Sequence, residues 1–232
     1  MINPSRGANQ TSSQTSCPLC LAEKVLLFFQ DPNCDYFQCS ICSLTFVPPG
    51  YFLSAEEEKA RYDTHENSPD DPAYRKFLSR LFDPLHPLLT PGSCGLDFGS
   101  GPGPTLSLMF EEQGHPMTLY DLFYAPNPTA LHQTYDFITA TEVLEHLHHP
   151  GQDLNRLWDC LKTGGYLGIM TKLTPAKGHF AQWYYKKDPT HVSFFSRSTF
   201  EWLAFQWQAN LTIIGNDVVI FRKKGSNFLL MD

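Results

Sequence analysis

The sequence lacks any long uncharged apolar run and any excess of basic residues. None of its apolar stretches approaches the roughly 20 residues that a helix needs to cross a bilayer, and residues 1–16 lack the apolar core of a secretion signal. The 17 lysines and arginines are outnumbered by 24 aspartates and glutamates, which gives a formal net charge of −7. We therefore expect a cytoplasmic protein without a membrane partner.

The negative charge also disfavours binding to nucleic acid, because phosphate backbones are held by a broad basic face. Four basic residues near the C-terminal strands, Arg197 and 222–224, could still form a local binding patch for nucleic acid. The composition leaves the oligomeric state open.

A chain of 232 residues, 42% of them hydrophobic, can bury one full core and a small appendage. Its first 16 residues are rich in Ser, Thr, Asn and Gln, a composition typical of a disordered leader. We divide the chain into a leader at 1–16, a metal-binding module at 17–50 and one main domain at 51–232.

Four of the seven cysteines form two Cys-x-x-Cys pairs, at 17–20 and 39–42, around an apolar run, a turn and a strand pattern. A reducing compartment disfavours disulfides, so the pairs are interpreted as metal ligands. Two such turns joined by a hairpin predict a zinc ribbon, with Cys17, Cys20, Cys39 and Cys42 around one tetrahedral ion. Four thiolates leave no open coordination position, which favours a structural ion. Cys34, Cys94 and Cys160 fall outside this spacing.

A glycine-rich turn, 99–103, follows the short strand pattern 95–98 and precedes a helical pattern from Thr105. Glycine lets the backbone approach a ligand closely and adopt positive φ at little cost. Asp121 closes the next hydrophobic segment, at a distance that suits a nucleotide-binding βαβ unit whose carboxylate accepts hydrogen bonds from ribose.

Hydrophobic and helical segments alternate after this turn, which predicts an α/β fold with a mostly parallel sheet and helices on both faces. The last two strand patterns, 211–214 and 217–222, predict an antiparallel hairpin at the sheet edge. Before the glycine turn, helical patterns lie at 55–61 and 74–81. Tyr62, His65 and Asn67 between them either face the pocket or serve as caps and surface contacts.

A cluster of acidic residues and histidines, 141–149, follows the strand pattern 136–139 at the edge where parallel sheets place their ligands. A helix beginning near Glu142 would put Glu142 and Glu145 on one face, with His146 beside them. Together with His191 they would hold a divalent ion with open positions. Without metal, His191 or His146 would act as general base, and packing roles remain as the alternative. We expect His148 and His149 to form a solvated turn.

Four aromatic residues precede His191 in the segment that leads to the next strand: Phe180, Trp183, Tyr184 and Tyr185. They either stack on a planar substrate or fill the core, which is the commoner use of such side chains.

The motifs at 97–103, 120–121, 135–147 and 161–170 stand in the order seen in class I S-adenosylmethionine-dependent methyltransferases, which the chain resembles over roughly 89–222. The resemblance implies a Rossmann-like fold and S-adenosylmethionine as cofactor. The cofactor-binding residues that it implies are Asp97, Gly99, Ser100, Gly101, Asp121, Thr141 and Glu142. Only 13 residues separate Asp121 from Tyr135, too few for the helix, strand and helix usual in the family, so we expect an abbreviated adenine pocket.

The Glu-x-x-Glu-His arrangement at 142–146, followed by His191, is similar to the metal site of small-RNA 3′-end 2′-O-methyltransferases and to a motif of ubiquinone-pathway O-methyltransferases. That similarity implies Mg²⁺ or a related ion on Glu142, Glu145, His146 and His191, where it would lower the pKa of a substrate hydroxyl. Glu-His-Leu after this strand also occurs in metal-free methyltransferases.

These observations leave three hypotheses for function. The first is methyl transfer to a hydroxyl, or to nitrogen or carbon, of a small molecule, with His191, His146 and Glu142 as catalytic candidates. The second is 2′-O-methylation of RNA. The third is a catalytically silent module that binds cofactor or a partner.

Overall fold

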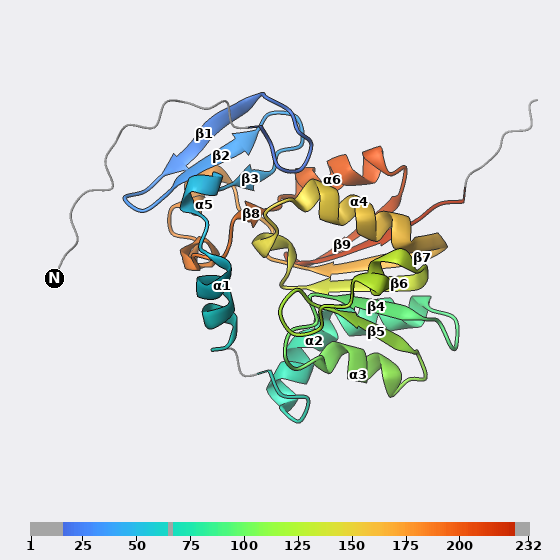
Figure 1. The fold of residues 1–232 in the computed structure, drawn as a ribbon. Helices are drawn as coiled ribbons and strands as arrows, with labels where there is room; N and C mark the ends of the chain where they lie inside the picture. The colour runs from blue at the N-terminus through green and yellow to red at the C-terminus, as the bar shows by residue number, and fades with distance from the viewer. Residues whose placement is uncertain (1–15, 65–66, 226–232) are drawn as a thin grey trace, which may run out of the picture.

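The computed structural model describes residues 16–64 and 67–225. It contains a six-stranded sheet in the order β5-β4-β6-β7-β10-β9 and a four-stranded sheet in the order β1-β2-β3-β8 (Figure 1). The expected leader lies outside the described residues except for Ser16. No helix among the described residues is both long enough and apolar enough to cross a membrane.

The larger sheet has the predicted α/β architecture. Its strands are β4 (Gly95–Phe98), β5 (Met117–Tyr120), β6 (Tyr135–Thr141), β7 (Leu161–Met170), β9 (Asn210–Ile214) and β10 (Val218–Arg222). β5, β4, β6 and β7 run parallel, while β10 is antiparallel to both β7 and β9. The closing hairpin therefore forms as expected, with β10 inserted between β7 and β9.

Helices cover both faces of this sheet. One hydrophobic cluster joins it to α4 (Pro150–Cys160) and α6 (Arg197–Gln206), and another joins it to α2 (Pro72–Leu85) and α3 (Thr105–Glu111). Phe137 belongs to one cluster and Ile138 to the other, because successive side chains of a strand point to opposite faces.

The connection between β5 and β6 contains only a 3₁₀ helix, Pro128–His132. No strand or α-helix intervenes between Asp121 and Tyr135, all of whose residues are described. The sheet consequently ends at β5 on this side, as the short spacing predicts.

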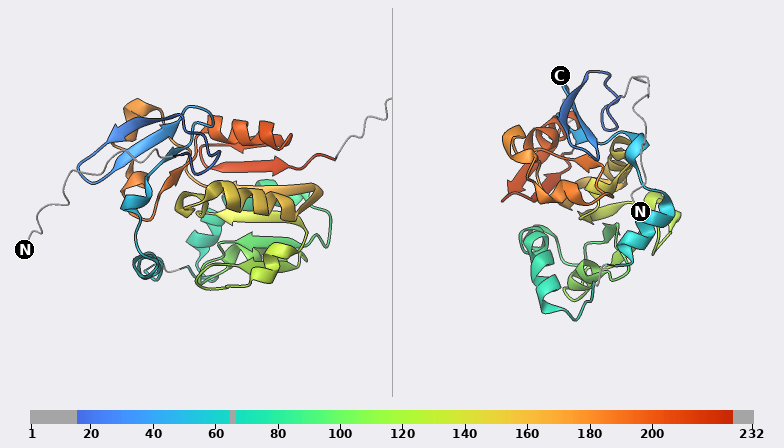
Figure 2. Two further views of the ribbon diagram at one scale, coloured as in Figure 1. Left: turned by 45° about the horizontal axis from the view of Figure 1, so that its top comes forward. Right: turned by 90° about the vertical axis from the view of Figure 1, so that its left-hand side faces the viewer.

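The smaller sheet joins the N-terminal module to the main domain. β1 (Val25–Gln30), β2 (Asp35–Cys39) and β3 (Thr45–Phe46) come from the N-terminal module, and β8 (Ser193–Phe194) comes from the main domain. Thr45 pairs with Phe194 and Phe46 with Ser193. Figures 1 and 2 show the blue N-terminal strands lying against the orange segment that contains β8. The boundary expected at residue 50 is thus crossed by a shared sheet.

Two helices begin with local signals that the sequence displays. Ser54 caps α1 (Ala55–Tyr62): its hydroxyl accepts a hydrogen bond from the Glu57 amide, and its own amide donates to the Glu57 carboxylate. Ser196 and Thr199 form the same reciprocal cap on α6. Such caps satisfy amide groups that have no partner within the helix. The other helical segments are α5 (Lys177–Phe180) and 3₁₀ helices at Pro49–Tyr51, His86–Leu88, Leu144–His146 and Tyr184–Lys187.

Candidate active site

The glycine turn after β4 needs glycine for two separate reasons. Gly99 and Gly101 have φ values of 75° and 62°, in the left-handed region that side chains disfavour. A Cβ on Gly99 would also lie 2.2 Å from Cγ2 of Val143, and one on Gly103 would lie 1.9 Å from the carbonyl oxygen of Asn67. The turn is therefore packed closely on the segments that follow β6 and precede α2.

Asp97 is buried under this turn, only 3% exposed. Its carboxylate accepts hydrogen bonds from the hydroxyls of Thr139, at 2.7 Å, and Ser107, at 2.9 Å. Burial raises the pKa of Asp97, while the two hydroxyls lower it. The side chain is thus held in one orientation by groups on β6 and α3.

Asp121 links the glycine turn to the loop after β5. One carboxylate oxygen accepts a hydrogen bond from the Gly101 amide at 2.9 Å, and the other accepts from the amides of Phe123 and Tyr124 at 2.8 and 3.0 Å. The carboxylate lies at the carboxyl end of a parallel strand, where open α/β sheets bind their ligands.

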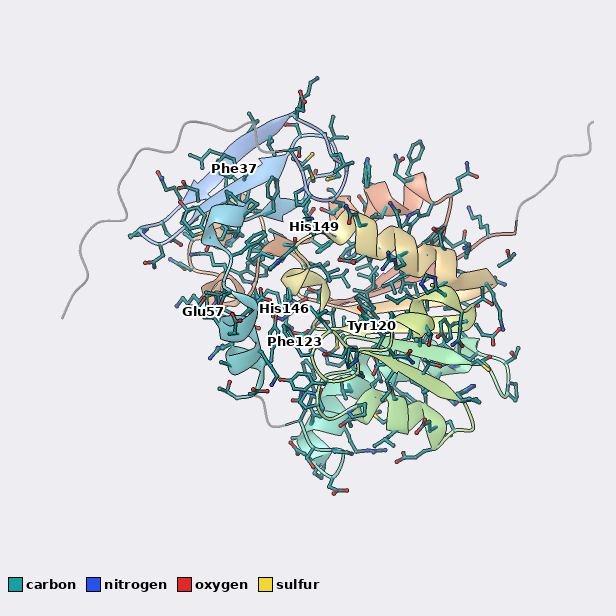
Figure 3. The ribbon with its side chains drawn as sticks, in the orientation of Figure 1. Phe37, Glu57, Tyr120, Phe123, His146 and His149 are labelled. Atoms are coloured by element: carbon teal, nitrogen blue, oxygen red, sulfur yellow. The ribbon has the colours of Figure 1, made fainter. Side chains whose placement is uncertain are left out.

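A cavity of about 670 Å³ opens at this edge of the sheet. It brings together all the sequence-predicted cofactor and metal candidates of the main domain: Asp97, Gly99, Ser100, Gly101, Asp121, Thr141, Glu142, Glu145, His146 and His191. Tyr62 and Asn67 also line it, whereas His65 lies outside the described residues. In Figure 3, His146 and Phe123 lie between α1 and the strand ends.

The helix expected near Glu142 does not form. Glu142 has a φ of 52°, in the left-handed region, and the chain makes only a 3₁₀ helix at Leu144–His146 before α4 starts at Pro150. A helix needs a run of right-handed backbone, which the left-handed Glu142 interrupts, and the Glu142 amide still donates to the Met170 carbonyl at 2.7 Å, so pairing with β7 continues one residue past the strand. Glu142 and Glu145 approach each other through this turn instead of along a helix face.

Tyr185 bridges the two glutamates. Its hydroxyl donates to a carboxylate oxygen of Glu145 and lies 3.2 Å from Oε2 of Glu142. Oε1 of Glu142 is buried and has no hydrogen-bond partner among the described residues. Burial and then the neighbouring Glu145 raise the pKa of Glu142 to about 8, and burial also raises the pKa of Glu145. This pair of carboxyls therefore favours either a shared proton or a cation between them.

His146 and His191 lie beside this pair with their rings 4.7 Å apart. Nδ1 of His191 lies 2.7 Å from the carbonyl of Tyr185, and Nδ1 of His146 lies 3.2 Å from that of Thr190. A carbonyl oxygen can only accept a hydrogen bond, so Nδ1 of each imidazole must carry the proton, and this fixes the tautomer of both rings. Burial lowers the pKa of His191 below its ordinary value, so its imidazole is neutral at pH 7 with Nε2 as the basic atom.

Three of the four expected divalent-ion ligands form a group. Ligand atoms of Glu145, His146 and His191 lie within 4.8 Å of one another, and Glu142 is not part of this group. One carboxylate and two imidazoles, each ring held by a backbone carbonyl, suit a transition metal. Both oxygens of Glu145, however, already accept hydrogen bonds, from Tyr185 and from Thr171.

Helix α1 covers one side of the cavity with side chains that sequence reasoning missed. Glu58 pairs with His148 at 2.8 Å, and Arg61 pairs with Asp188 at 2.9 Å. His148 is therefore not in a solvated turn as expected, because it also stacks on Phe52 at 4.2 Å. His149 is exposed, in line with that expectation. The spacing of Glu58 and Arg61, one helical turn apart, is the only signal in the sequence for this contact.

The aromatic segment before His191 divides between two roles. Phe180 is fully buried against the N-terminal module, whereas Tyr184 and Tyr185 line the cavity. The hydrogen bonds of Tyr185 to Glu142 and Glu145 were not foreseen, since nothing in the sequence spacing indicates them.

The four cysteines of the N-terminal module come together as expected. Their sulfur atoms lie within 4.8 Å of one another, with 3.5 Å between Cys17 and Cys42 and between Cys20 and Cys39. All four are free thiols, and the hydrogen bond from Cys42 lowers the pKa of Cys17 to about 6. Four converging sulfur ligands fit a tetrahedral zinc ion. Cys34, Cys94 and Cys160 are not part of this group.

Comparisons with known proteins agree with this geometry. A family model described as "Methyltransferase domain" matches residues 65–215. The fold is similar to that of 1,6-didemethyltoxoflavin-N1-methyltransferase of Burkholderia thailandensis, solved with 1,6-didemethyltoxoflavin and S-adenosylhomocysteine, at 18% identity and a TM-score of 0.50, over 78% of this chain and 96% of that chain.

Two further solved structures are similar at lower TM-scores. A SAM dependent methyltransferase from Archaeoglobus fulgidus has 16% identity and a TM-score of 0.49 over 64% of this chain and 94% of its own. A putative methyltransferase from Bacillus halodurans has 17% identity and a TM-score of 0.47 over 59% and 67%. The search of curated protein sequences gave no match.

Proposed function

The chain belongs to the methyltransferase domain family, as a class I S-adenosylmethionine-dependent enzyme, and on that premise we propose that it methylates a hydroxyl group of a small molecule. The observation that supports the hydroxyl as acceptor is His191. A neutral imidazole with a fixed tautomer lies in the same cavity as the glycine turn. An alcohol needs a base when it attacks carbon, and imidazole is well suited to take its proton near neutral pH.

The residues present fit the cofactor. Asp121 would accept hydrogen bonds from its ribose hydroxyls, and the glycine turn would hold its methionine portion. Glu142, with its partnerless Oε1, would face the positively charged sulfur. When bound, the cofactor supplies an electrophilic methyl group, and the protein mainly aligns the acceptor and removes its proton.

The base role of His191 is tested by His191→Gln, with His149→Gln as control because His149 is exposed and outside the cavity. Release of S-adenosylhomocysteine would be followed across a panel of small hydroxyl compounds. We expect kcat to fall about 10²–10⁴-fold in the first variant and to be unchanged in the control. In the wild type, the rate should rise with pH through the lowered pKa of His191 and then level off. Equal rates in both variants would rule out the base role.

Metal assistance is the second candidate, favoured by the group of Glu145, His146 and His191. These residues would hold a divalent ion, which would lower the pKa of the acceptor hydroxyl. Titration of Mn²⁺ followed by electron paramagnetic resonance tests this without any substrate. Binding that is lost in Glu145→Gln and retained in Glu56→Gln, a change at a glutamate of α1 outside the cavity, would support the metal. Absence of binding, with activity resistant to chelator, would leave His191 as the base.

We also propose that Cys17, Cys20, Cys39 and Cys42 hold one structural zinc ion. The four sulfur atoms leave no position open for a substrate, and the small N-terminal core gains a cross-link that its apolar residues alone would not supply.

The RNA and silent-module hypotheses gain no such support. Ionisable residues lining the cavity are mostly acidic, which opposes a polyanion: Glu58, Asp97, Asp121, Glu142, Glu145 and Asp188 against Arg61 and Lys187. A silent module would need residues for cofactor binding alone, and the converging carboxyl and imidazole groups go beyond that need.

A further inference from the structure

A second cavity, of about 590 Å³, lies beside the first at the carboxyl end of β7. It is formed by the chain after β7, the aromatic segment, the start of α6 and the turn between β9 and β10. The side chains important here are Lys172, Thr174, Trp183, Tyr184 and Arg197. Tyr184 lines both cavities, which makes them neighbours.

The wall of this second cavity carries excess positive charge. Both charged residues that line it, Lys172 and Arg197, are basic, and Lys172 pairs at 2.6 Å with the buried carboxylate of Asp217, which also pairs with Arg80. Arg197 is exposed and has no hydrogen-bond or ion-pair partner among the described residues. The first cavity is mostly acidic, and the two therefore attract groups of opposite charge.

Thr174 adds a hydroxyl without a partner. Its backbone amide donates to the Phe195 carbonyl at 2.8 Å, which fixes the residue, but its Oγ1 is shielded from solvent and makes no hydrogen bond among the described residues. Leaving a shielded hydroxyl without a hydrogen bond destabilises the protein, and a ligand oxygen that bonds to it would remove this penalty.

We propose that this cavity binds an anionic oxygen group, a carboxylate or a phosphate, carried by the methyl acceptor. Arg197 can pair with such a group through two parallel N–H donors, Lys172 adds positive charge, and Trp183 and Tyr184 supply aromatic surface in the same cavity. The proposal rests on the proposed function. It means that the acceptor is oriented by charge: its anionic end lies in the second cavity while its hydroxyl lies near His191 in the first.

Isothermal titration calorimetry tests this with three probes on protein saturated with S-adenosylhomocysteine: benzoate, phenyl phosphate and the neutral benzamide. The variants are Arg197→Gln and, as matched control, Arg222→Gln. Arg222 is also exposed, but it lies opposite Tyr166, in the middle of β7, and does not line the second cavity. Both variants remove one positive charge.

We expect at least one anion to bind and benzamide to bind more than tenfold more weakly. Arg197→Gln should weaken the anion by about tenfold or more, as for a hydrogen bond between charged groups, and Arg222→Gln should not. Preference for benzoate would identify a carboxylate, and preference for phenyl phosphate a phosphate. The proposal is overturned if neither anion binds, if benzamide binds equally well, or if both variants behave alike.

The same experiment distinguishes failure of the proposed function from failure of the second-cavity proposal. If S-adenosylhomocysteine does not bind, the cofactor assignment fails, while titration of the anions into cofactor-free protein still reports on the second cavity. If the cofactor product binds and the anions do not, only the second-cavity proposal fails.

Discussion

Replacing Phe180 by alanine tests whether the N-terminal module and the main domain form one cooperative unit. The Phe180 ring is fully buried and lies 5.1, 5.6 and 5.2 Å from the rings of Phe28, Phe29 and Tyr36 in the N-terminal hairpin. On the other side it packs on Trp183 and Phe194 of the main domain. The ring thus sits in the middle of the interface between the two parts.

Burial of this kind gives a large expected effect. Phe→Ala in a packed core costs about 3–5 kcal/mol, out of a total stability of about 5–15 kcal/mol for an ordinary domain. Phe205→Ala is the matched control, because Phe205 is 79% exposed and a surface change usually alters stability by less than about 0.5 kcal/mol.

Urea unfolding followed by circular dichroism and by tryptophan fluorescence measures this difference. We expect both signals to shift together to lower urea in Phe180→Ala and to stay near the wild type in Phe205→Ala. A cost below about 1 kcal/mol for Phe180→Ala, well short of the range for packed cores, would refute the reasoning. So would a change confined to a minor separate transition, since the two parts would then unfold independently.

Three further predictions concern the individual sites. Asp121→Ala should weaken S-adenosylmethionine binding by about 1.5–3 kcal/mol, and unchanged affinity in calorimetry would remove Asp121 from the ribose site. The zinc proposal predicts one zinc per chain in elemental analysis, lost in Cys39→Ser and retained in Cys94→Ser, a change at an exposed thiol outside the group. The pKa of Glu142 is raised from 4.5 to about 8, so its contribution to stability is present below pH 4.5 and lost as pH rises through 8. Glu142→Gln should therefore gain stability relative to the wild type between pH 5 and pH 9, and a pH-independent difference in thermal unfolding would contradict this.

Features set by neighbouring residues were predictable from the sequence. The strand, glycine turn and helix around Gly99 and Gly101 follow from local conformational preferences. The missing strand after Asp121 follows from chain length alone, since 13 residues cannot span three elements. The convergence of the four cysteines follows from their paired spacing.

Features that depend on distant parts of the chain were not predictable. The residues after β6 have a helical pattern, yet Glu142 has a left-handed φ of 52° and its amide pairs with Met170 of β7, so the chain turns there and does not start a helix. Tyr185 reaches Glu142 and Glu145 only because the aromatic segment folds back over the sheet edge. The two-residue strands β3 and β8 are too short to show any periodicity.

The pairing of β3 with β8 has a consequence for the order in which a newly made chain can fold. The cysteine pairs leave the ribosome early, and with them the first three strands of the smaller sheet. The partner strand at Ser193–Phe194 follows only after most of the larger sheet has been synthesised. Until then β3 presents an unpaired edge, which is prone to pair with other chains. Early capture of zinc by the cysteines would hold the nascent hairpin in shape during this interval, so zinc shortage should lower the yield of folded protein before it affects the finished enzyme.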